Sequence, residues 1–291
     1  MRFASELTPE HLSRIFGLRI RAKAVLEGAL AGWHRSPFHG YSSEFSQYRG
    51  YVPGDDTRRL DWKVYGRRDQ LVVRQYRDET NASIYLAMDT SASMGHRGGG
   101  DFSKLEYGGI LAASLALLAE RQRDALSLTH GGPGMQEFLP PESGPVRTRE
   151  VLHRLETLAP GGGTELGELF AGMAARIGNQ GFVFLFTDAW QEPGAIAAGL
   201  RRVRGKSRST SLVLLRTPEE MDFFPGGAYR LKDLETGEEV DAESPQSKAA
   251  YFEAVRSHLH TIAGECTRLG IRLIQIRTDW PLDASMRKIL P

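Results

Sequence analysis

The spacing of apolar residues predicts alternating helices and strands along most of this chain. Apolar residues recur at helical spacing over residues 9–30, which predicts a first helix. Residues 31–56 are rich in Gly, Ser, Tyr and Pro and indicate loops with short extended pieces. The strands predicted after them are 71–76, 82–88, 125–129, 136–139, 181–186, 211–215 and 271–276, and the helices are 103–122, 146–158, 165–177, 194–204, 246–269 and 282–290.

This alternation favours the α/β fold class, with a doubly wound, mostly parallel, Rossmann-like sheet covered by helices on both faces. One segment departs from it. Residues 229–231 and 239–241 flank a turn and predict a β-hairpin, so we expect an insertion at about 226–243. We expect this hairpin to pack with residues 41–76 as a small accessory β layer.

The chain has 291 residues, enough for one large domain with an appendage. We divide it into an N-terminal helix and extended accessory segment, 1–80, and an α/β domain, 81–291. The net charge of +1 points to neither nucleic acid nor an anionic membrane. Residues 110–119 form the longest apolar stretch, about half of what a bilayer requires. With a single cysteine, Cys266, we expect a cytoplasmic protein without membrane insertion.

Oxygen-bearing side chains stand in three loops at the ends of predicted strands or the starts of helices. Asp89, Ser91 and Ser93 alternate after one strand, and alternate residues of an extended turn face the same way. Three glycines lead to Thr164 at the start of a helix, and Asp188 ends an apolar strand. Ligands of open α/β sheets bind outside the carboxyl ends of the strands. We therefore expect these five side chains to converge on one ion.

The predicted donor set consists only of carboxylate and hydroxyl oxygens. Hard cations prefer such oxygens, which predicts Mg²⁺ as the cofactor, or Mn²⁺ or Ca²⁺ in its place. If the carboxylates bind through water, the cation keeps positive charge at an open position. That position would attract an Asp or Glu side chain from another molecule.

The pattern Asp89-x-Ser91-x-Ser93, with the later Thr164 and Asp188, resembles the metal-ion-dependent adhesion site of von Willebrand factor A domains. The resemblance implies that the serines and the threonine ligate the metal directly or through water, and that the aspartates act mostly through water. It also implies that an acidic residue of a protein partner completes the coordination shell. The expected fold is then of the von Willebrand A type.

Residues 44–79, which include Arg49-Gly50-Tyr51-Val52-Pro53-Gly54-Asp55 and Asp61-Trp62, resemble the bacterial and archaeal family known as domain of unknown function 58. Residues 233–238 and 277–279 are similar to that family too. Longer members carry membrane helices ahead of this region, which we do not expect in this chain. The resemblance implies association with AAA+ ATPases of the MoxR type, for which the von Willebrand A partner would act as adaptor in protein or complex maturation.

The segment from Arg49 to Arg77 contains eight Lys and Arg residues against four Asp residues. Interspersed signs favour internally paired turns over a nucleic-acid stripe. A partner-docking surface beside the metal is the functional alternative, and aromatic and Arg side chains suit both roles. The residues predicted to bind a partner are Arg58, Arg59, Trp62 and Arg67.

Other functions are compatible with parts of this pattern. Asp and Ser after a strand often cap a turn, and Asp89 could be the nucleophile of a metal-dependent phosphate-ester hydrolase. Haloacid dehalogenase-type phosphatases place a second carboxylate where this chain has Ser91, so the general acid is missing. We therefore expect a non-enzymatic protein-binding module, with the hydrolase as the alternative. A site that has lost its metal and acts only as a scaffold is a third possibility.

Overall fold

The computed structural model describes residues 17–31, 44–52, 60–68, 70–77, 82–131, 137–161, 165–178, 181–222, 229–232, 239–242 and 245–290. The chain forms two compact units. One consists of Met1–Arg35 together with Ser83–Pro291, and the other is Ser36–Ala82. The metal residues predicted from the sequence all belong to the larger unit.

A six-stranded sheet forms the centre of the larger unit. Adjacent strands are parallel, except that β5 runs antiparallel to β4 at one edge. Apart from Phe182, all residues of β6 are buried, as expected for a strand covered on both faces. The order of the strands is β10 (Arg272–Arg277), β7 (Ser207–Arg216), β6 (Gly181–Thr187), β3 (Ser83–Met88), β4 (Ala125–His130) and β5 (Glu137–Ser143).

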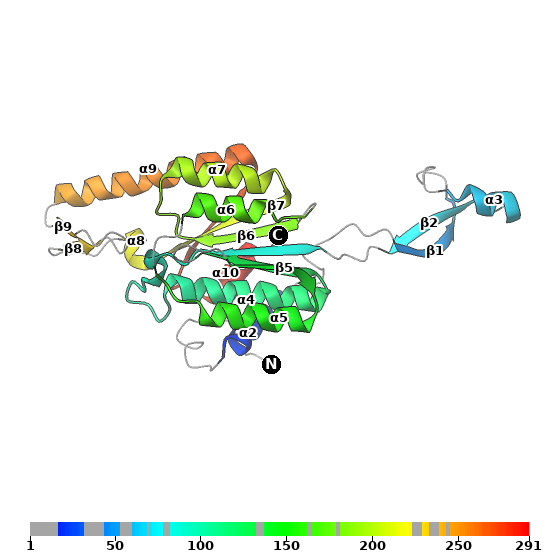
Figure 1. Ribbon diagram of the computed structural model, residues 1–291, viewed down its shortest axis with the longest axis horizontal. Coiled ribbons are helices and arrows are strands. Elements are labelled where there is room, and N and C mark those ends of the chain that lie inside the picture. Colours follow the sequence, from blue (N-terminus) through cyan, green and yellow to red (C-terminus); the bar gives the residue numbers. More distant parts are fainter. Residues whose placement is uncertain are drawn as a thin grey trace. The chain divides into compact units, whose positions relative to one another are not determined.

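Helices cover both faces of the sheet, which confirms the predicted doubly wound α/β class (Figure 1). One face carries α6 (Leu166–Ala174), α7 (Pro193–Arg204) and α9 (Pro245–Leu269). The opposite face carries α2 (Leu18–Leu30), α4 (Lys104–Gln122), α5 (Pro145–Thr157) and α10 (Leu282–Ile289). No helix in the described ranges combines the length and apolar character that a bilayer crossing requires.

The N-terminal helix α2 belongs to the larger unit, whereas the sequence grouped it with the accessory segment. It buries Ala22, Val25 and Leu26. Its backbone is fixed to α4 and α10, because Ser114 Oγ donates to the carbonyl of Ala22 at 3.2 Å and Arg287 donates to the carbonyl of Gly28 at 3.2 Å. Residues 9–16 of the predicted helix lie outside the described residues.

Two short β ribbons accompany the main sheet. In the smaller unit, β1 (Glu44–Gly50) pairs antiparallel with β2 (Val72–Arg77), and α3 (Trp62–Arg68) lies between them in the sequence. The predicted hairpin is formed by β8 (Tyr229–Lys232) and β9 (Glu239–Ala242). The two ribbons are separate two-stranded sheets, and whether they pack together as one accessory layer stays a prediction. Each of these strands pairs along one edge with the other strand of its own ribbon.

The order of the strands fixes where a ligand can bind. From β3 the chain continues to β4 on one side, whereas β6, β7 and β10 lie on the other. The winding therefore reverses between β3 and β6, and in open α/β sheets the crevice at this switch point is the usual binding site. Asp89 and Asp188 follow directly after these two strands.

Candidate metal centre at the carboxyl ends of β3 and β6

Asp89 is held firmly at the end of β3, with 1% of its surface exposed. Its backbone N–H donates to the carbonyl of Phe186 on β6 at 2.9 Å, which joins the two strand ends. Its Oδ1 accepts from the backbone N–H of Ser91 at 2.9 Å, and its Oδ2 accepts from the hydroxyl of Thr187 at 2.6 Å. Each carboxylate oxygen has a further lone pair. The carboxylate is therefore fixed in orientation and can still accept a ligand.

The two serines of the loop place their hydroxyls side by side. Ser91 Oγ and Ser93 Oγ are 3.1 Å apart. Ser91 precedes the short helix η2 (Ala92–Gly95), but its side chain makes no capping hydrogen bond to that helix. The Asp89 carboxylate caps the turn by accepting the Ser91 N–H. The two serine hydroxyl oxygens are therefore available as ligands for a cation.

These oxygens fit a small hard cation. With metal–oxygen bonds of about 2.1 Å, neighbouring ligands of an octahedral Mg²⁺ lie about 3 Å apart, which matches the 3.1 Å between the two serine oxygens. Within the described part of the chain, no group of three or more His, Cys, Asp or Glu side chains could hold a metal ion. A cation at this position would therefore need the hydroxyls as well as the carboxylates.

Asp188 is equally buried at the end of the neighbouring strand, and it is paired with a lysine. Its Oδ2 accepts from Nζ of Lys104 at 2.5 Å, and both side chains are 1% exposed. Lys104 is the first residue of α4, where the helix dipole disfavours a positive charge. The same ammonium group donates to Oε1 of Glu220 at 2.7 Å. The carboxylates of Asp188 and Glu220 therefore both stabilise the buried ammonium group of Lys104.

Glu220 connects this ion cluster to α8 (Pro218–Asp222). Its Oε1 also accepts from the indole N–H of Trp190 at 3.2 Å, and its Oε2 accepts from the backbone N–H of Thr217 at 2.8 Å. Burial raises the pKa of Glu220, but the charge and the hydrogen bond of Lys104 outweigh this effect and hold the pKa below its ordinary value. Glu220 is therefore charged at neutral pH and rigidly placed.

The sequence pattern does not reveal three residues of this centre, Thr187, Lys104 and Glu220. Lys104 leaves one signal, because it is a cation at the start of a helix that is apolar over most of its length. Glu220 leaves no local signal, since it stands 116 residues from Lys104. Together with Asp89 and Asp188, the residues Glu220 and Lys104 give the cluster three carboxylates and one ammonium group. The surplus is two negative charges, which one divalent cation can neutralise.

Thr164 lies outside the described residues, together with the two glycines before it. The chain leading to it is attached to the metal loop, because the N–H of Gly161 donates to the carbonyl of Thr90 at 3.0 Å. Whether Thr164 joins the donors stays a prediction. The predicted ligands that lie at the ends of β3 and β6 are Asp89, Ser91, Ser93 and Asp188.

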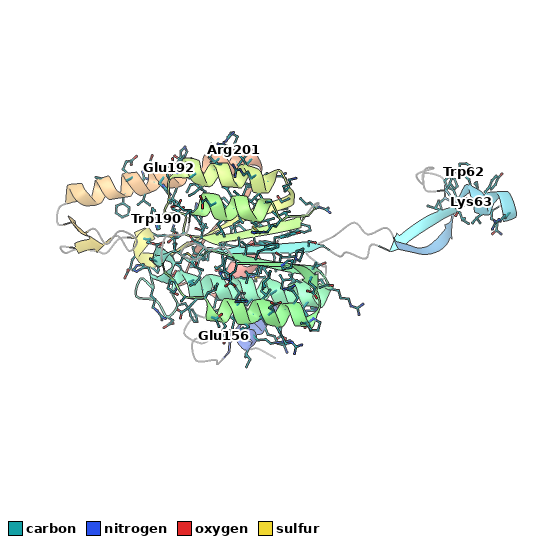
Figure 2. All side chains as sticks on the ribbon, in the orientation of Figure 1. Trp62, Lys63, Glu156, Trp190, Glu192 and Arg201 are labelled. Atoms are coloured by element: carbon teal, nitrogen blue, oxygen red, sulfur yellow. The ribbon has the colours of Figure 1, made fainter. Side chains whose placement is uncertain are left out.

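Trp190 follows Asp188 by two residues in the chain and is partly exposed; Figure 2 labels its side chain. The Arg216 guanidinium lies 4.0 Å from the centre of its ring, and His258 stacks against the ring at 5.6 Å. His258 is fixed in turn by a 2.7 Å hydrogen bond between Nε2 and the carbonyl of Ala189, which has a φ of 56°. An ordered aromatic ring next to the candidate metal position suits contact with a protein partner.

The burial of Asp89 gives a pH-dependent stability without metal. Burial, followed by repulsion from Asp188, raises the pKa of Asp89 from 3.8 to about 6. The protonated carboxyl therefore favours folding. This contribution is complete below pH 3.8 and is lost as the pH rises through about 6, and the difference corresponds to about 3 kcal/mol.

We expect the parent protein in EDTA to lose stability relative to Asp89→Asn as the pH rises from 4 to 7. Urea unfolding at each pH measures this difference. Asp101→Asn, at an exposed aspartate of the neighbouring loop, is the control and should stay parallel to the parent. A pH-independent gap between the parent and Asp89→Asn would contradict the raised pKa.

The residues predicted to bind a partner and the predicted metal ligands belong to different units of the chain. Trp62 and Arg67 are exposed on α3 of the unit Ser36–Ala82. Arg58 and Arg59 belong to the same unit but lie outside the described residues. The metal residues belong to the other unit. A docking surface beside the metal stays a prediction.

Comparison with protein families gives a match over most of the chain. The family described as "Protein of unknown function DUF58" matches residues 47–261. Uncharacterized protein Rv1480 of Mycobacterium tuberculosis (strain H37Rv) is 24% identical over 284 residues, which cover 93% of this chain and 86% of that protein. Uncharacterized protein YeaD of Bacillus subtilis is 37% identical over 59 residues, 20% of this chain and 15% of that protein.

Solved structures with a related arrangement include the conserved hypothetical protein BatB from Bacteroides thetaiotaomicron. It is 16% identical with a TM-score of 0.48, over 72% of this chain and 97% of that chain. The SpRpn10 VWA domain is 8% identical with a TM-score of 0.39, over 71% of this chain and 94% of that chain. The α/β fold of the present chain is shown by its own six-stranded sheet.

Proposed function

We propose that this chain, which belongs to the DUF58 family, is a binding module that holds a divalent cation between β3 and β6 and presents it to an acidic residue of a protein partner. One observation carries the proposal. Two serine hydroxyls lie 3.1 Å apart beside a buried, doubly hydrogen-bonded Asp89. The likeness of this pattern to the metal-ion-dependent adhesion site supports the same reading.

The cation would be Mg²⁺, with Mn²⁺ or Ca²⁺ as substitutes, because all the donors are hard oxygens. Ser91, Ser93 and Asp89 would hold it. It would supply positive charge at an open coordination position. Lys104 neutralises one carboxylate of the cluster, so the bound cation meets two uncompensated negative charges and not three. A site that is close to neutral when loaded can accept a further carboxylate from a partner.

The proposal is a non-enzymatic role. Both oxygens of Asp89 accept a hydrogen bond from the chain itself, which fixes the carboxylate in orientation and leaves a lone pair on each oxygen for a metal ion. The position of the general acid is occupied by Ser91. These features favour binding over phosphate-ester hydrolysis.

The partner we propose is a MoxR-type AAA+ ATPase in the cytoplasm, with this chain as its adaptor in protein or complex maturation. This step rests on the resemblance to the DUF58 family. The ordered Trp190 ring beside Asp188 would provide an apolar contact next to the bridging carboxylate.

Binding of a purified MoxR-type ATPase from the same organism tests the bridge. We expect Ser91→Ala/Ser93→Ala to weaken binding at least tenfold in Mg²⁺ buffer, because two cation ligands are lost. Biolayer interferometry with the immobilised ATPase measures this. The control is Ser209→Ala, an exposed serine on β7.

The same binding measurement is repeated in EDTA. EDTA also removes Mg²⁺ from the nucleotide that the ATPase binds. The double variant in Mg²⁺ buffer is therefore the decisive sample. Unchanged binding by the double variant would refute the metal bridge. Failure of the parent protein to bind would refute the choice of an ATPase as partner, and it would leave the cation site to be judged by metal-dependent stability.

A further inference from the structure

The short helix α3 is fixed to the end of the β1–β2 ribbon. Leu60 forms a β-bridge with Val73, and the N–H of Asp61 donates to the carbonyl of Val72 at 3.0 Å. The buried Asp61 carboxylate then accepts the N–H groups of Lys63 and Val64 at 2.9 and 3.2 Å. These bonds close the first turn of the helix. The helix is therefore held in a defined orientation on its ribbon.

The helix presents aromatic rings to solvent. Trp62 is 62% exposed and Tyr65 is 40% exposed, and their rings meet edge to face with centroids 6.2 Å apart. Figure 2 shows Trp62 and Lys63 together on α3. Trp, Tyr and Arg are the residue types that most often anchor protein interfaces. We call Trp62, Lys63, Tyr65 and Arg67 the α3 face.

The described side chains between Gly50 and Val73 provide little core for the smaller unit. Of its hydrophobic residues between Gly50 and Val73 whose burial is described, Val73 is the buried one, while Val52 and Leu71 are 53% and 41% exposed. An isolated two-stranded ribbon is at best marginally stable in water. An apolar partner surface over the α3 face would therefore bury apolar area that these residues leave exposed.

The α3 face is also positively charged. Lys63 and Arg67 are exposed, and neither has an ion-pair partner among the described residues. Residues 62–68 contain no Asp or Glu. Exposed cationic side chains on the same short helix as an exposed Trp complement a surface that is acidic around an apolar pocket. A lipid surface is less suitable, because membrane binding by a helix scales with the apolar area it buries, and α3 has only seven residues.

We propose that the α3 face is a docking surface for an acidic protein segment that carries an apolar side chain or pocket for Trp62. The surface lies in the unit Ser36–Ala82 and needs no metal. It would therefore bind independently of the cation site, and its test is independent of the proposed function.

Site-specific cross-linking in cells tests this proposal. The full chain carries the photo-cross-linker p-benzoylphenylalanine in place of Tyr65, and cross-linked peptides are identified by mass spectrometry. We expect peptides rich in Asp and Glu from another protein, and at least a fivefold loss of the cross-link when Lys63→Glu and Arg67→Glu are added. Lys206→Glu, at an exposed lysine of the larger unit, should leave the yield unchanged.

A synthetic peptide with the cross-linked sequence then serves as a soluble probe for the parent chain. Trp62→Ala should weaken its binding at least tenfold and added salt should weaken it further. Val146→Ala, at a valine that is 64% exposed in the larger unit, should change nothing. Circular dichroism checks that the variants fold.

Every other result of these experiments counts against the proposal. Cross-links to this same chain would mean that a second copy or the larger unit covers the face. Cross-links to lipid, or flotation of the parent but not Trp62→Ala with phosphatidylglycerol vesicles, would assign it to a membrane. Neutral or basic peptides, the absence of cross-links, or a yield indifferent to charge reversal would also overturn it.

Discussion

Replacing Lys104 by Met is expected to lower the free energy of unfolding of the metal-free protein by about 3–5 kcal/mol, the usual cost of removing one partner of a buried ion pair. Lys104 donates to Asp188 and Glu220, and its own side chain is 1% exposed. Without the ammonium group, two buried carboxylates face each other with no counter-charge. The melting temperature should fall by roughly 10 °C.

Thermal unfolding in EDTA measures this loss. Lys206→Met removes an exposed lysine of the same unit and should change the melting temperature by less than about 2 °C. A second measurement separates a local charge effect from general misfolding. Mn²⁺ should raise the melting temperature of Lys104→Met more than that of the parent, because the free Asp188 strengthens the site for a cation. A small loss of stability together with an unchanged Mn²⁺ response would contradict this account of the cluster.

The second large effect is the loss of metal-dependent stability in Asp89→Asn. A cation that binds only the folded state stabilises it by about 2.7 kcal/mol at a concentration of one hundred times Kd. For a domain of this size we expect Mg²⁺ or Mn²⁺ to raise the melting temperature of the parent by about 5–10 °C. Asn at position 89 keeps an oxygen for the Ser91 N–H but removes the charge, so the rise should disappear.

Differential scanning calorimetry with and without metal tests this expectation. Asp101→Asn again serves as the control, since it removes an exposed charge near the loop, and it should keep the full rise. An unchanged melting temperature of the parent across Mg²⁺, Mn²⁺ and Ca²⁺ would support the scaffold alternative, in which the site no longer binds metal. A rise that persists in Asp89→Asn would place the cation elsewhere.

The helices and strands of the larger unit could be predicted because their signal is local. The continuous apolar run of β6 and the helical spacing within α4 follow from the residues of each segment alone. The same reasoning gave β1 only as a short extended piece within residues 31–56, and it missed α3. Asp61 closes the first turn of α3 through local bonds, but its burial depends on the bridge between Leu60 and Val73, which are not neighbours in the sequence.

The metal loop was the most predictable part of the candidate site. The two hydroxyls of Ser91 and Ser93 do lie close together, at 3.1 Å, although Ser93 is part of the short helix η2 and not of the extended turn that the pattern predicted. The end of each parallel strand is also marked in the sequence by the change from apolar to polar residues. Asp89 and Asp188 could therefore be assigned to one edge of the sheet before its strand order was known.

The sequence by itself determined the α/β class, the positions of most elements and the oxygen-rich loop at Asp89. The tertiary structure alone decided that α2 belongs to the larger unit, that the two ribbons are separate sheets, and that Lys104 lies between Asp188 and Glu220. The two carboxylates are 84 and 116 residues from Lys104 in the chain. Periodicity is set by neighbouring residues, whereas the partner of a buried charge is set by which strand ends and helices the fold brings together.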